Sequence, residues 1–202
     1  GSMAWLKEYK YKLIKEFLSP AELSLLKIYC KNKLKENMWT TDGQCPFTPT
    51  WIKDPLMQAL LETKLDVVEA HSGLKLFKSY SYFRYYVFGS ILKPHYDRPA
   101  CEVSVSACIH KTDKWPLVIN NNHYELEEGD ALIYLGCEMS HSRYDYFNGD
   151  GMAQVFFHYV DQNGPFTHHR DDEYLVVTGQ GCSPKDEKIL DKLKRSSSET
   201  RE

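Results

Sequence analysis

The sequence predicts an α+β protein whose core is an antiparallel β-sandwich or β-barrel. The 202-residue chain is 42% hydrophobic, which is enough apolar material for a buried core. Helical spacing of apolar residues predominates in the first third of the chain. About eight short strand-like runs follow without helices between them, and this order favours helices packed against a β core. A chain of this length is expected to form one domain with appendages at its ends.

Two helices are expected near the N-terminus, after a short strand at 11–14. The run Ser19-Pro20-Ala21-Glu22 is typical of a helix start, because serine caps the helix, proline suits its first turn and glutamate completes a capping box. Apolar residues then recur at helical spacing to about Lys35. A second helix is expected over 54–73, beginning again with a cap and a proline and ending at glycine.

The strands are expected where aromatic and β-branched residues alternate with polar ones. In chain order these runs are 76–88, 91–97, 101–110, 115–119, 123–126, 131–137 and 152–160. Three consecutive asparagines at 120–122 are typical of a β-hairpin. The charged segment 183–202 predicts an exposed short helix with a frayed tail.

Composition narrows the class of protein further. The net charge of −3 argues against a protein that coats nucleic acid, so we expect no nucleic-acid partner. The six cysteines contain no CxxC pair, which excludes a zinc finger and favours free thiols in a reducing, cytoplasmic compartment. No apolar run approaches the roughly 18 residues of a membrane span, so no membrane partner is expected either. Gly1-Ser2-Met3 has the appearance of an expression scar.

One constellation carries chemistry. His95 and Asp97 are two residues apart, so in an extended strand they point to the same side. His141 follows the predicted strand 131–137, which we expect to lie beside the strand of His95. Two imidazoles and one carboxylate on one face of a metal are the facial triad of non-heme Fe(II) oxygenases, which leaves other positions free for cosubstrate and O₂.

The segments around this constellation resemble one known family. The run YVFGSILKPHYD at 86–97 is similar to the pattern Y-x-x-G-S-x-L-x-x-H-x-D, and EGDALIY at 128–134, followed by His141, is similar to the element G-D-A-L-x-F/Y…H. Residues 154–161 resemble the closing strand, and 16–22 resemble the helix before the β structure. These patterns are those of the Fe(II)/2-oxoglutarate-dependent dioxygenases, in their prolyl-hydroxylase-like branch. The resemblance covers roughly residues 10–165.

The resemblance implies a double-stranded β-helix, or jelly roll, with the N-terminal helices against one sheet. It implies that His95, Asp97 and His141 are the catalytic Fe(II) ligands, and that 2-oxoglutarate and O₂ are consumed to give succinate and CO₂. The substrate would be hydroxylated, and could be a peptidyl proline, an amino acid or a small metabolite. The aspartate itself favours hydroxylation, because halogenating relatives have a small residue there.

The chain departs from the family where relatives bind the distal carboxylate of 2-oxoglutarate. They usually place an arginine or lysine about ten residues past the second histidine, but residues 150–153 contain no cation. A buried dicarboxylate needs a charged partner, ideally a bidentate arginine. The candidates are Arg143, Arg84 and Arg98, and we favour Arg143 because it lies two residues past His141.

Other residues are assigned by the resemblance or by position. The resemblance places Tyr86 and His110 at the cosubstrate. We expect Arg84, Arg98 and His158 to line the substrate pocket. The tyrosine-rich face of 80–86 could instead stack single-stranded nucleic acid, although packing in a core or pocket is favoured.

Loops and boundaries complete the expectations. The loop 39–51 either packs or covers the site, and His168 and His169 are expected in a solvated loop. We divide the chain into a helical buttress at 4–75, a catalytic core at 76–165 and a C-terminal extension at 166–202.

Two alternative functions remain open at the level of sequence. A jelly-roll binding module that has lost catalysis would explain the missing cation at 150–153. A zinc hydrolase could use the same three ligands with an activated water. It would need a general base beside the metal, and Glu102 is the obvious neighbour.

Overall fold

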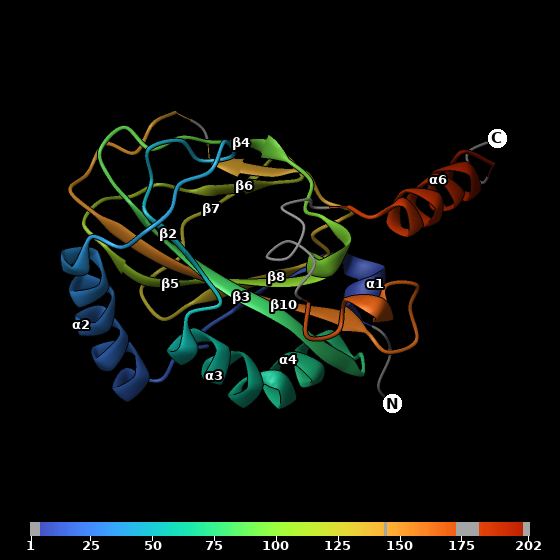
Figure 1. Ribbon diagram of the computed structural model, residues 1–202, viewed down its shortest axis with the longest axis horizontal. Coiled ribbons are helices and arrows are strands. Elements are labelled where there is room, and N and C mark those ends of the chain that lie inside the picture. The colour runs from blue at the N-terminus through green and yellow to red at the C-terminus, as the bar shows by residue number, and fades with distance from the viewer. Residues whose placement is uncertain (1–4, 144, 173–181, 200–202) are drawn as a thin grey trace.

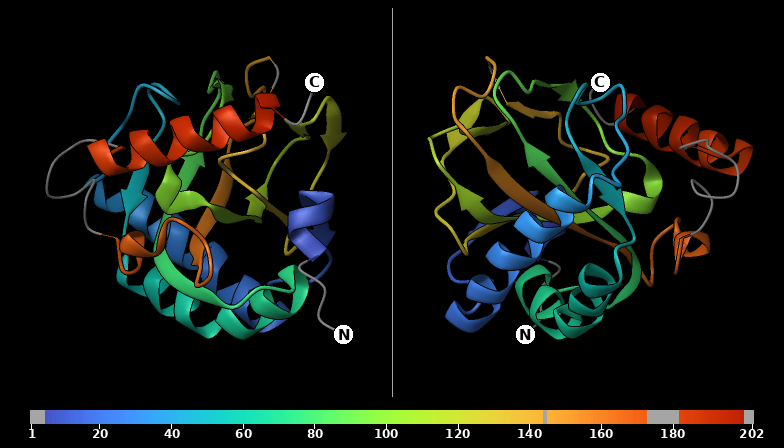
Figure 2. Two further views of the ribbon diagram at one scale, coloured as in Figure 1. Left: turned by 90° about the vertical axis from the view of Figure 1, so that its right-hand side faces the viewer. Right: turned by 60° about the vertical axis from the view of Figure 1, so that its left-hand side comes forward.

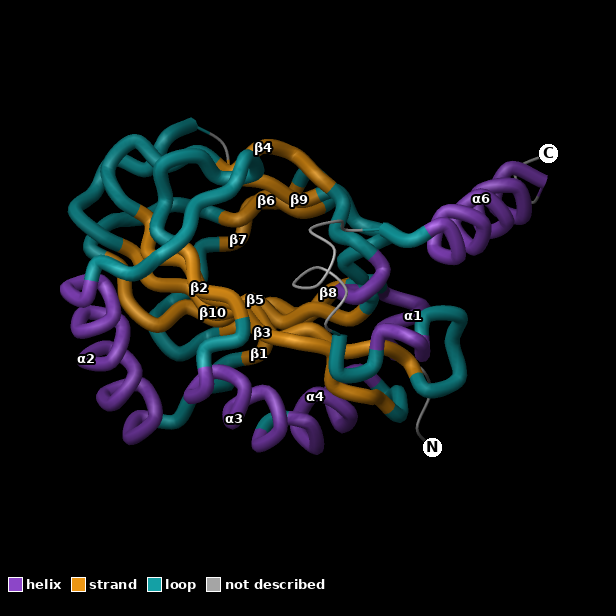
Figure 3. Tube along the Cα trace, in the orientation of Figure 1, coloured by secondary structure: helices purple, strands orange, loops and turns teal. Residues whose placement is uncertain are grey.

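The computed structural model describes residues 5–143, 145–172 and 182–199, with 195–199 described by their backbone alone. The strands form two antiparallel sheets that face each other, and helices cover the outer face of the larger sheet (Figures 1 and 3). The expected antiparallel β core with N-terminal helices is therefore confirmed. The predicted scar at 1–3 and the end of the predicted tail, 200–202, lie outside the described residues.

The larger sheet contains, among the described residues, strands in the order β1-β8-β5-β10-β3-β2, and each neighbouring pair is antiparallel. In that order the strands are β1 (Tyr11–Ile14), β8 (Ala131–Tyr134), β5 (Val103–Lys111), β10 (Met152–Asp161), β3 (Leu76–Tyr86) and β2 (Thr50–Ile52). The long strands β3 and β10 pair along nearly their whole lengths. The N-terminal segment therefore contributes two edge strands, the predicted β1 and the unpredicted β2.

The smaller sheet has the order β4-β9-β6-β7. Its strands are β4 (Leu92–His95), β9 (His141–Arg143), β6 (Leu117–Ile119) and β7 (Asn122–Tyr124). The predicted asparagine hairpin joins β6 to β7. Asn120 and Asn121 have φ values of 51° and 62°, the left-handed pair that a tight type I′ turn requires.

The helices are α1 (Trp5–Tyr9), α2 (Pro20–Glu36), α3 (Pro55–Thr63), α4 (Leu65–Ser72) and α6 (Pro184–Glu199). The predicted capping box is present, since the Ser19 amide donates to Glu22 Oε1 at 2.8 Å and the Glu22 amide donates to Ser19 Oγ at 3.2 Å. The single helix predicted over 54–73 is wrong: the chain bends at Lys64, whose Nζ donates to the Glu22 carboxylate at 2.7 Å.

The predicted C-terminal helix is confirmed as α6, which projects away from both sheets (Figures 1 and 2). Among the described residues, no helix combines the length and apolar character that a membrane crossing requires.

The two faces of the larger sheet differ in chemistry because strand side chains alternate. On β10, Val155 and Phe157 pack against the helices in the main hydrophobic core. Gln154, Phe156 and His158 alternate with them and face the smaller sheet. Gln154 donates at 2.8 Å to Ser106 Oγ on the neighbouring strand β5. The space between the sheets is therefore lined by polar and aromatic groups.

One expected neighbour is wrong. The strand predicted at 131–137 ends at Tyr134 and lies in the larger sheet, so it does not run beside the strand of His95. A turn closed by the amides of Glu138 and Met139 on the Leu135 carbonyl carries the chain across to the smaller sheet. His141 then opens β9, and β9 pairs with β4.

Candidate metal centre

The two predicted histidine ligands lie opposite each other on neighbouring strands. His95 ends β4 and His141 begins β9, the two are register partners, and their ring centroids are 4.2 Å apart. Each Nδ1 lies close to a backbone carbonyl, at 2.7 Å from Lys93 O and 2.8 Å from Met139 O. Because a carbonyl only accepts, each Nδ1 carries the proton, and each Nε2 can present its lone pair to a metal.

Asp97 completes the triad. Its Oδ1 lies 3.1 Å from His141 Nε2 and 3.5 Å from His95 Nε2. Metal–ligand bonds of about 2.0–2.2 Å at near right angles place ligand atoms about 3 Å apart, so the three groups fit one ion. The triad is one of three groups of metal-ligating side chains among the described residues whose ligand atoms lie within 4.8 Å of one another.

Asp97 is held by its surroundings. Its amide donates to Gly136 O at 2.9 Å, and Ser104 Oγ lies 3.3 Å from its second carboxylate oxygen. A Cβ at Gly136 would collide with that same oxygen and with the Cys101 carbonyl, so only glycine fits there. Burial alone would raise the pKa of Asp97, but the charge and hydrogen bond of His141 outweigh it and hold that pKa well below its usual range.

Arg143 lies on β9 two residues after His141, as the sequence suggested, and is 3% exposed. Its Nη1 donates to the Trp115 carbonyl, and its guanidinium lies over the rings of Tyr86 and Trp115. Nε, Nη2 and the buried hydroxyl of Tyr86 make no well-formed hydrogen bond, and the adjacent Arg143 guanidinium partly offsets the burial that raises the pKa of Tyr86. Nε and Nη2 form the side-on edge of the guanidinium, which is the edge that binds a carboxylate with two bonds.

Each of the other two candidate anchors already has a carboxylate partner. Arg84 donates at 2.9 Å each to Asp42, Gln44 and Thr50, so it ties β3 to the loop 39–51. Arg98 donates through Nη2 to the Asp172 carboxylate and stacks over Tyr80 at 4.8 Å. Both arginines line a pocket of about 300 Å³ beside Asp97. Whether this pocket takes substrate stays a prediction, whereas Arg143 offers the side-on edge that an anchor needs.

The structure does not bring His110 to this centre. Its Nδ1 lies 3.0 Å from Glu128 Oε2, and the same carboxylate pairs with Lys27 of α2 at 2.6 Å. A bulge in the pairing of β5 with β10, between Ala153 and Gln154, shifts the register there. His110 therefore belongs to the helix-covered side, and the resemblance alone gave no sign of the bulge.

His158 and the tyrosine-rich strand face the space between the sheets. Burial lowers the pKa of His158 to about 4, so its ring is neutral at pH 7, and its Nδ1 lies 2.8 Å from Ser104 Oγ. The His158 ring lies against Tyr80 and Tyr82, at 4.9 and 5.3 Å between centroids. Tyr80 and Tyr86 are buried, so this face is no exposed platform for nucleic acid.

Of the second group of histidines, His168 is exposed as expected, whereas the expected solvated position is wrong for His169. His169 is 2% exposed, with Nδ1 at 2.9 Å from Asp172 and Nε2 at 2.9 Å from both oxygens of Asp186. His168 Nε2 lies 2.6 Å from the same Asp186. We call His168, His169 and Asp186 the C-terminal cluster.

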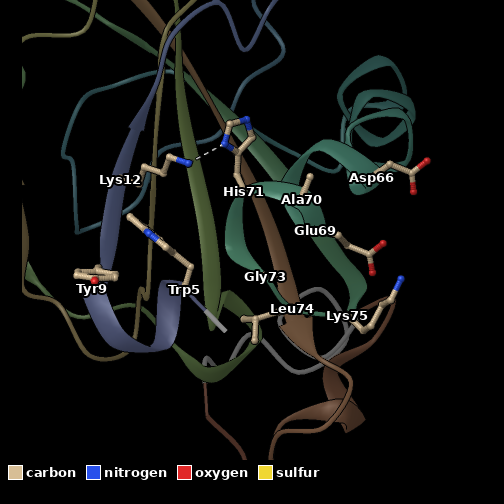
Figure 4. Close-up of a pocket in the computed structure, with 10 residues that line it drawn as sticks. All are labelled: Trp5, Tyr9, Lys12, Asp66, Glu69, Ala70, His71, Gly73, Leu74 and Lys75. Carbon is tan, nitrogen blue, oxygen red and sulfur yellow. Dashed lines mark hydrogen bonds between the residues drawn. The ribbon is translucent and has the colours of Figure 1, made fainter. Parts of the chain in front are cut away.

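A larger pocket of about 800 Å³ lies elsewhere, between α1, β1 and α4 (Figure 4). Its lining contains none of the predicted site residues, and its one drawn hydrogen bond joins Lys12 Nζ to His71 Nδ1 at 3.2 Å. The larger of these two pockets is therefore not the one that contains the predicted site residues.

Four contributors to the centre were missed from the sequence. These are Tyr134, whose ring lies 4.9 Å from that of His141, Gly136 and Ser104 at Asp97, and Trp115 at Arg143. Tyr134 lies within the matched EGDALIY run and Gly136 just after it, which is the one signal that could have indicated them.

Comparison with solved structures shows that this chain has the fold of the 2-oxoglutarate–Fe(II) oxygenases, prolyl hydroxylases included. A prolyl-4-hydroxylase of Pseudomonas putida aligns over 78% of this chain and 96% of its own, at 15% identity and a TM-score of 0.61. A prolyl hydroxylase of Trichoplax adhaerens in complex with a peptide fragment of hypoxia inducible factor aligns over 87% and 90%, at 10% identity and a TM-score of 0.63.

HygX of Streptomyces hygroscopicus, with nickel, 2-oxoglutarate and hygromycin B bound, aligns over 79% of this chain and 87% of its own, at 11% identity and a TM-score of 0.59. At these identities the likeness concerns the fold. Comparison of the sequence with protein-family models and with curated proteins gave no match.

Proposed function

We propose that this protein is an Fe(II)- and 2-oxoglutarate-dependent oxygenase that hydroxylates a small molecule or a peptide side chain and releases succinate and CO₂. The observation that carries the proposal is the combination of two features at the smaller sheet. His95, Asp97 and His141 converge at ligand distances, and Arg143 holds an unpartnered, buried guanidinium edge on the strand that carries His141. Two-oxoglutarate has both a metal-chelating end and a distal carboxylate, which matches this pair.

The residues of the triad would hold Fe(II), which when bound supplies the activation of O₂ for substrate oxidation. Asp97 stays ionised because of its lowered pKa, and Ser104 and Gly136 fix its orientation. The backbone carbonyls behind His95 and His141 hold the tautomer that presents Nε2.

Arg143 would bind the distal carboxylate of 2-oxoglutarate through Nε and Nη2, with the Tyr86 hydroxyl as a further donor. Burial excludes water from these donors, and this strengthens each charged hydrogen bond. The cation missing at 150–153 is then replaced by one on β9, so the departure from the family pattern does not by itself favour a binding module.

The zinc-hydrolase alternative required Glu102 as a general base, and the structure engages Glu102 elsewhere. Glu102 Oε1 accepts from the Asp161 amide at 2.7 Å, and Oε2 lies 3.7 Å from Lys7 Nζ. The carboxylate is therefore committed to β10 and the N-terminal helix.

Three further proposals accompany this function. The two sheets are proposed to be the halves of a jelly roll, supported by the fold of the neighbours. We keep the division into a buttress at 4–75, a core at 76–165 and an extension at 166–202. The six free cysteines support a reducing, cytoplasmic setting.

The decisive experiment measures succinate formed from 2-oxoglutarate by the Fe(II)-loaded protein without added substrate. We expect slow succinate formation that is lost in His95→Ala. In Arg143→Ala the 2-oxoglutarate concentration for half-maximal rate should rise about 10- to 100-fold, because charged hydrogen bonds worth about 1.5–3 kcal/mol disappear. Fe(II) affinity should stay within about twofold.

The matched control is Arg170→Gln, an exposed arginine at the far end of the larger sheet, whose 2-oxoglutarate requirement should not change. An Arg143→Ala protein with an unchanged requirement would remove Arg143 from the anchor role. Iron binding without any affinity for 2-oxoglutarate would instead favour the binding module.

A further inference from the structure

We propose that the pocket beside Asp97 takes a substrate bearing a carboxylate on an apolar body, and that Arg98 binds this carboxylate. The inference rests on the proposed function, because it names the class of substrate for the same centre. It is carried by the walls of the pocket and by the unsatisfied donors of Arg98.

The pocket has the size and lining of a small-ligand site. Its volume is about 300 Å³, it reaches the ligand Asp97, and much of its wall is aromatic, from Tyr80, Tyr82 and Tyr96. Tyr82 also stacks on Phe156 at 4.5 Å, so this wall is packed from behind. Aromatic walls with a few placed polar groups are typical of small-molecule sites and favour a ligand with an apolar body.

Arg98 follows Asp97 directly, and its guanidinium carries buried donors that nothing in the described structure satisfies. Nη2 donates to Asp172, but Nε and Nη1 have no hydrogen-bond partner. A buried guanidinium donor left without an acceptor costs about 1–3 kcal/mol, so an acceptor on the ligand would recover that cost. Arg98 thus offers unused hydrogen-bond donors directly after the proposed metal ligand Asp97.

The position of Arg98 is fixed from behind by a chain of ion pairs. Asp172 accepts from Arg98 and lies 2.9 Å from His169 Nδ1, and His169 Nε2 lies 2.9 Å from Asp186. Asp186 is fully buried and also accepts from the Ser183 amide and hydroxyl. The C-terminal cluster therefore orients Arg98 before a ligand arrives, which reduces the entropy cost of binding.

Charge selects a carboxylate rather than a phosphate. The charge of Arg84 is balanced by Asp42, and that of Arg98 by Asp172. The pocket therefore offers hydrogen-bond donors with little excess positive charge. A carboxylate monoanion that accepts from one of the free Arg98 donors suits this environment, whereas a phosphate dianion would leave uncompensated charge in a largely buried site.

The experiment uses the full chain loaded with Mn(II) and saturating 2-oxoglutarate, so that no turnover is needed and the Arg143 edge is filled. The probes are benzoate and benzamide, which share one shape and differ in charge. Binding is measured by the paramagnetic relaxation that the metal imposes on the ring protons of each probe. We expect benzoate to bind close to the metal, at least about tenfold more tightly than benzamide.

Two variants test whether Arg98 causes the preference for benzoate over benzamide. In Arg98→Gln the preference for benzoate should fall below about twofold, and in the control Arg170→Gln it should persist. If Arg98→Gln does not fold, the ratio of benzoate affinity to benzamide affinity in the unsubstituted protein still tests whether the pocket prefers a carboxylate. Equal binding of the two probes would overturn the proposal, and so would tighter binding of phenyl phosphate than of benzoate.

The outcome separates this inference from the proposed function. If Mn(II) and 2-oxoglutarate bind but benzoate is not preferred, the substrate class is wrong and the oxygenase proposal stands. If neither Mn(II) nor 2-oxoglutarate binds, the proposed function itself fails.

Discussion

Two groups of histidine and aspartate in this chain use the same residue types and differ in the spacing of their polar atoms. In the triad, the Nε2 atoms lie 3.1 and 3.5 Å from Asp97 Oδ1, separations that also suit neighbouring ligands of one ion. In the C-terminal cluster, the corresponding distances to Asp186 are 2.6 and 2.9 Å, which are those of direct hydrogen bonds. Ligand-type residues therefore do not define a metal site on their own.

The second difference lies in what stands behind each histidine. In the triad, backbone carbonyls accept from both Nδ1 atoms, so both rings direct Nε2 toward Asp97. In the C-terminal cluster, His169 lies between two carboxylates, Asp172 and Asp186, which favour the protonated ring. The arrangement of the triad suits a metal ion. The arrangement of the C-terminal cluster suits ion pairs that attach α6 to residues 168–172.

The largest expected effect comes from removing one histidine from each group. Loss of a residue that only hydrogen-bonds to a metal ligand typically weakens metal binding about 10- to 100-fold. His95→Ala removes a proposed ligand itself, so it should weaken Mn(II) binding by more than that. His168→Ala should leave Mn(II) affinity within about twofold. Isothermal titration calorimetry of both variants checks the comparison, with circular dichroism to verify folding. A large loss in His168→Ala would show that the C-terminal cluster also holds metal.

A smaller effect is expected at the glycine against Asp97. Gly136→Ala places a methyl group against Asp97 and the Cys101 carbonyl, so we expect Mn(II) affinity to fall about 10- to 100-fold. Stability should fall by about 1–3 kcal/mol from overpacking, measured by urea denaturation. Gly43→Ala is the matched control, because nothing lies within 4 Å of the added atom there. Equal effects at both glycines would contradict the proposed support of Asp97.

The smallest effect is a pH dependence of opposite sign in the two groups. Burial alone would lower the pKa of His141 and of His169, but their carboxylate neighbours outweigh burial and raise both. Metal binding requires a deprotonated imidazole, so Mn(II) affinity should increase as the pH rises through the pKa of His141. The stabilising contribution of His169 is complete below its unfolded pKa of about 6.5 and is lost as the pH rises through its folded pKa.

Hydrogen exchange of the amides at 183–190, corrected for intrinsic rates, checks the second half of this prediction between pH 6 and 9. We expect protection to decrease with pH while Mn(II) affinity increases. A parallel rise of both quantities would mean that protonation of His169 does not stabilise the attachment of α6.

The parts of the fold that the sequence predicted are those set by local chemistry. The capping box at Ser19 and the asparagine hairpin at 120–122 depend on neighbours within a few residues, and both are present. The proposed metal ligands His95 and Asp97 could be picked out because they share one short segment with a resemblance around it, and the structure brings both close to His141.

What the sequence did not predict depends on contacts between distant segments. The three-residue strand β9 is too short to show alternation, and it exists because β4 and β6 flank it. The burial of His169 depends on Asp186, 17 residues further on. The bulge that turns His110 toward Glu128 is a property of pairing between β5 and β10.

The shortness of β9 has a consequence for how this centre can change. Its three residues carry both a metal ligand, His141, and the proposed anchor Arg143, on one side of one strand. A slip of β9 by a single residue would rotate both side chains outward together, because strand side chains alternate. The proposed iron and cosubstrate sites therefore depend on the same register, and insertions or deletions within 135–140 are expected to abolish both at once.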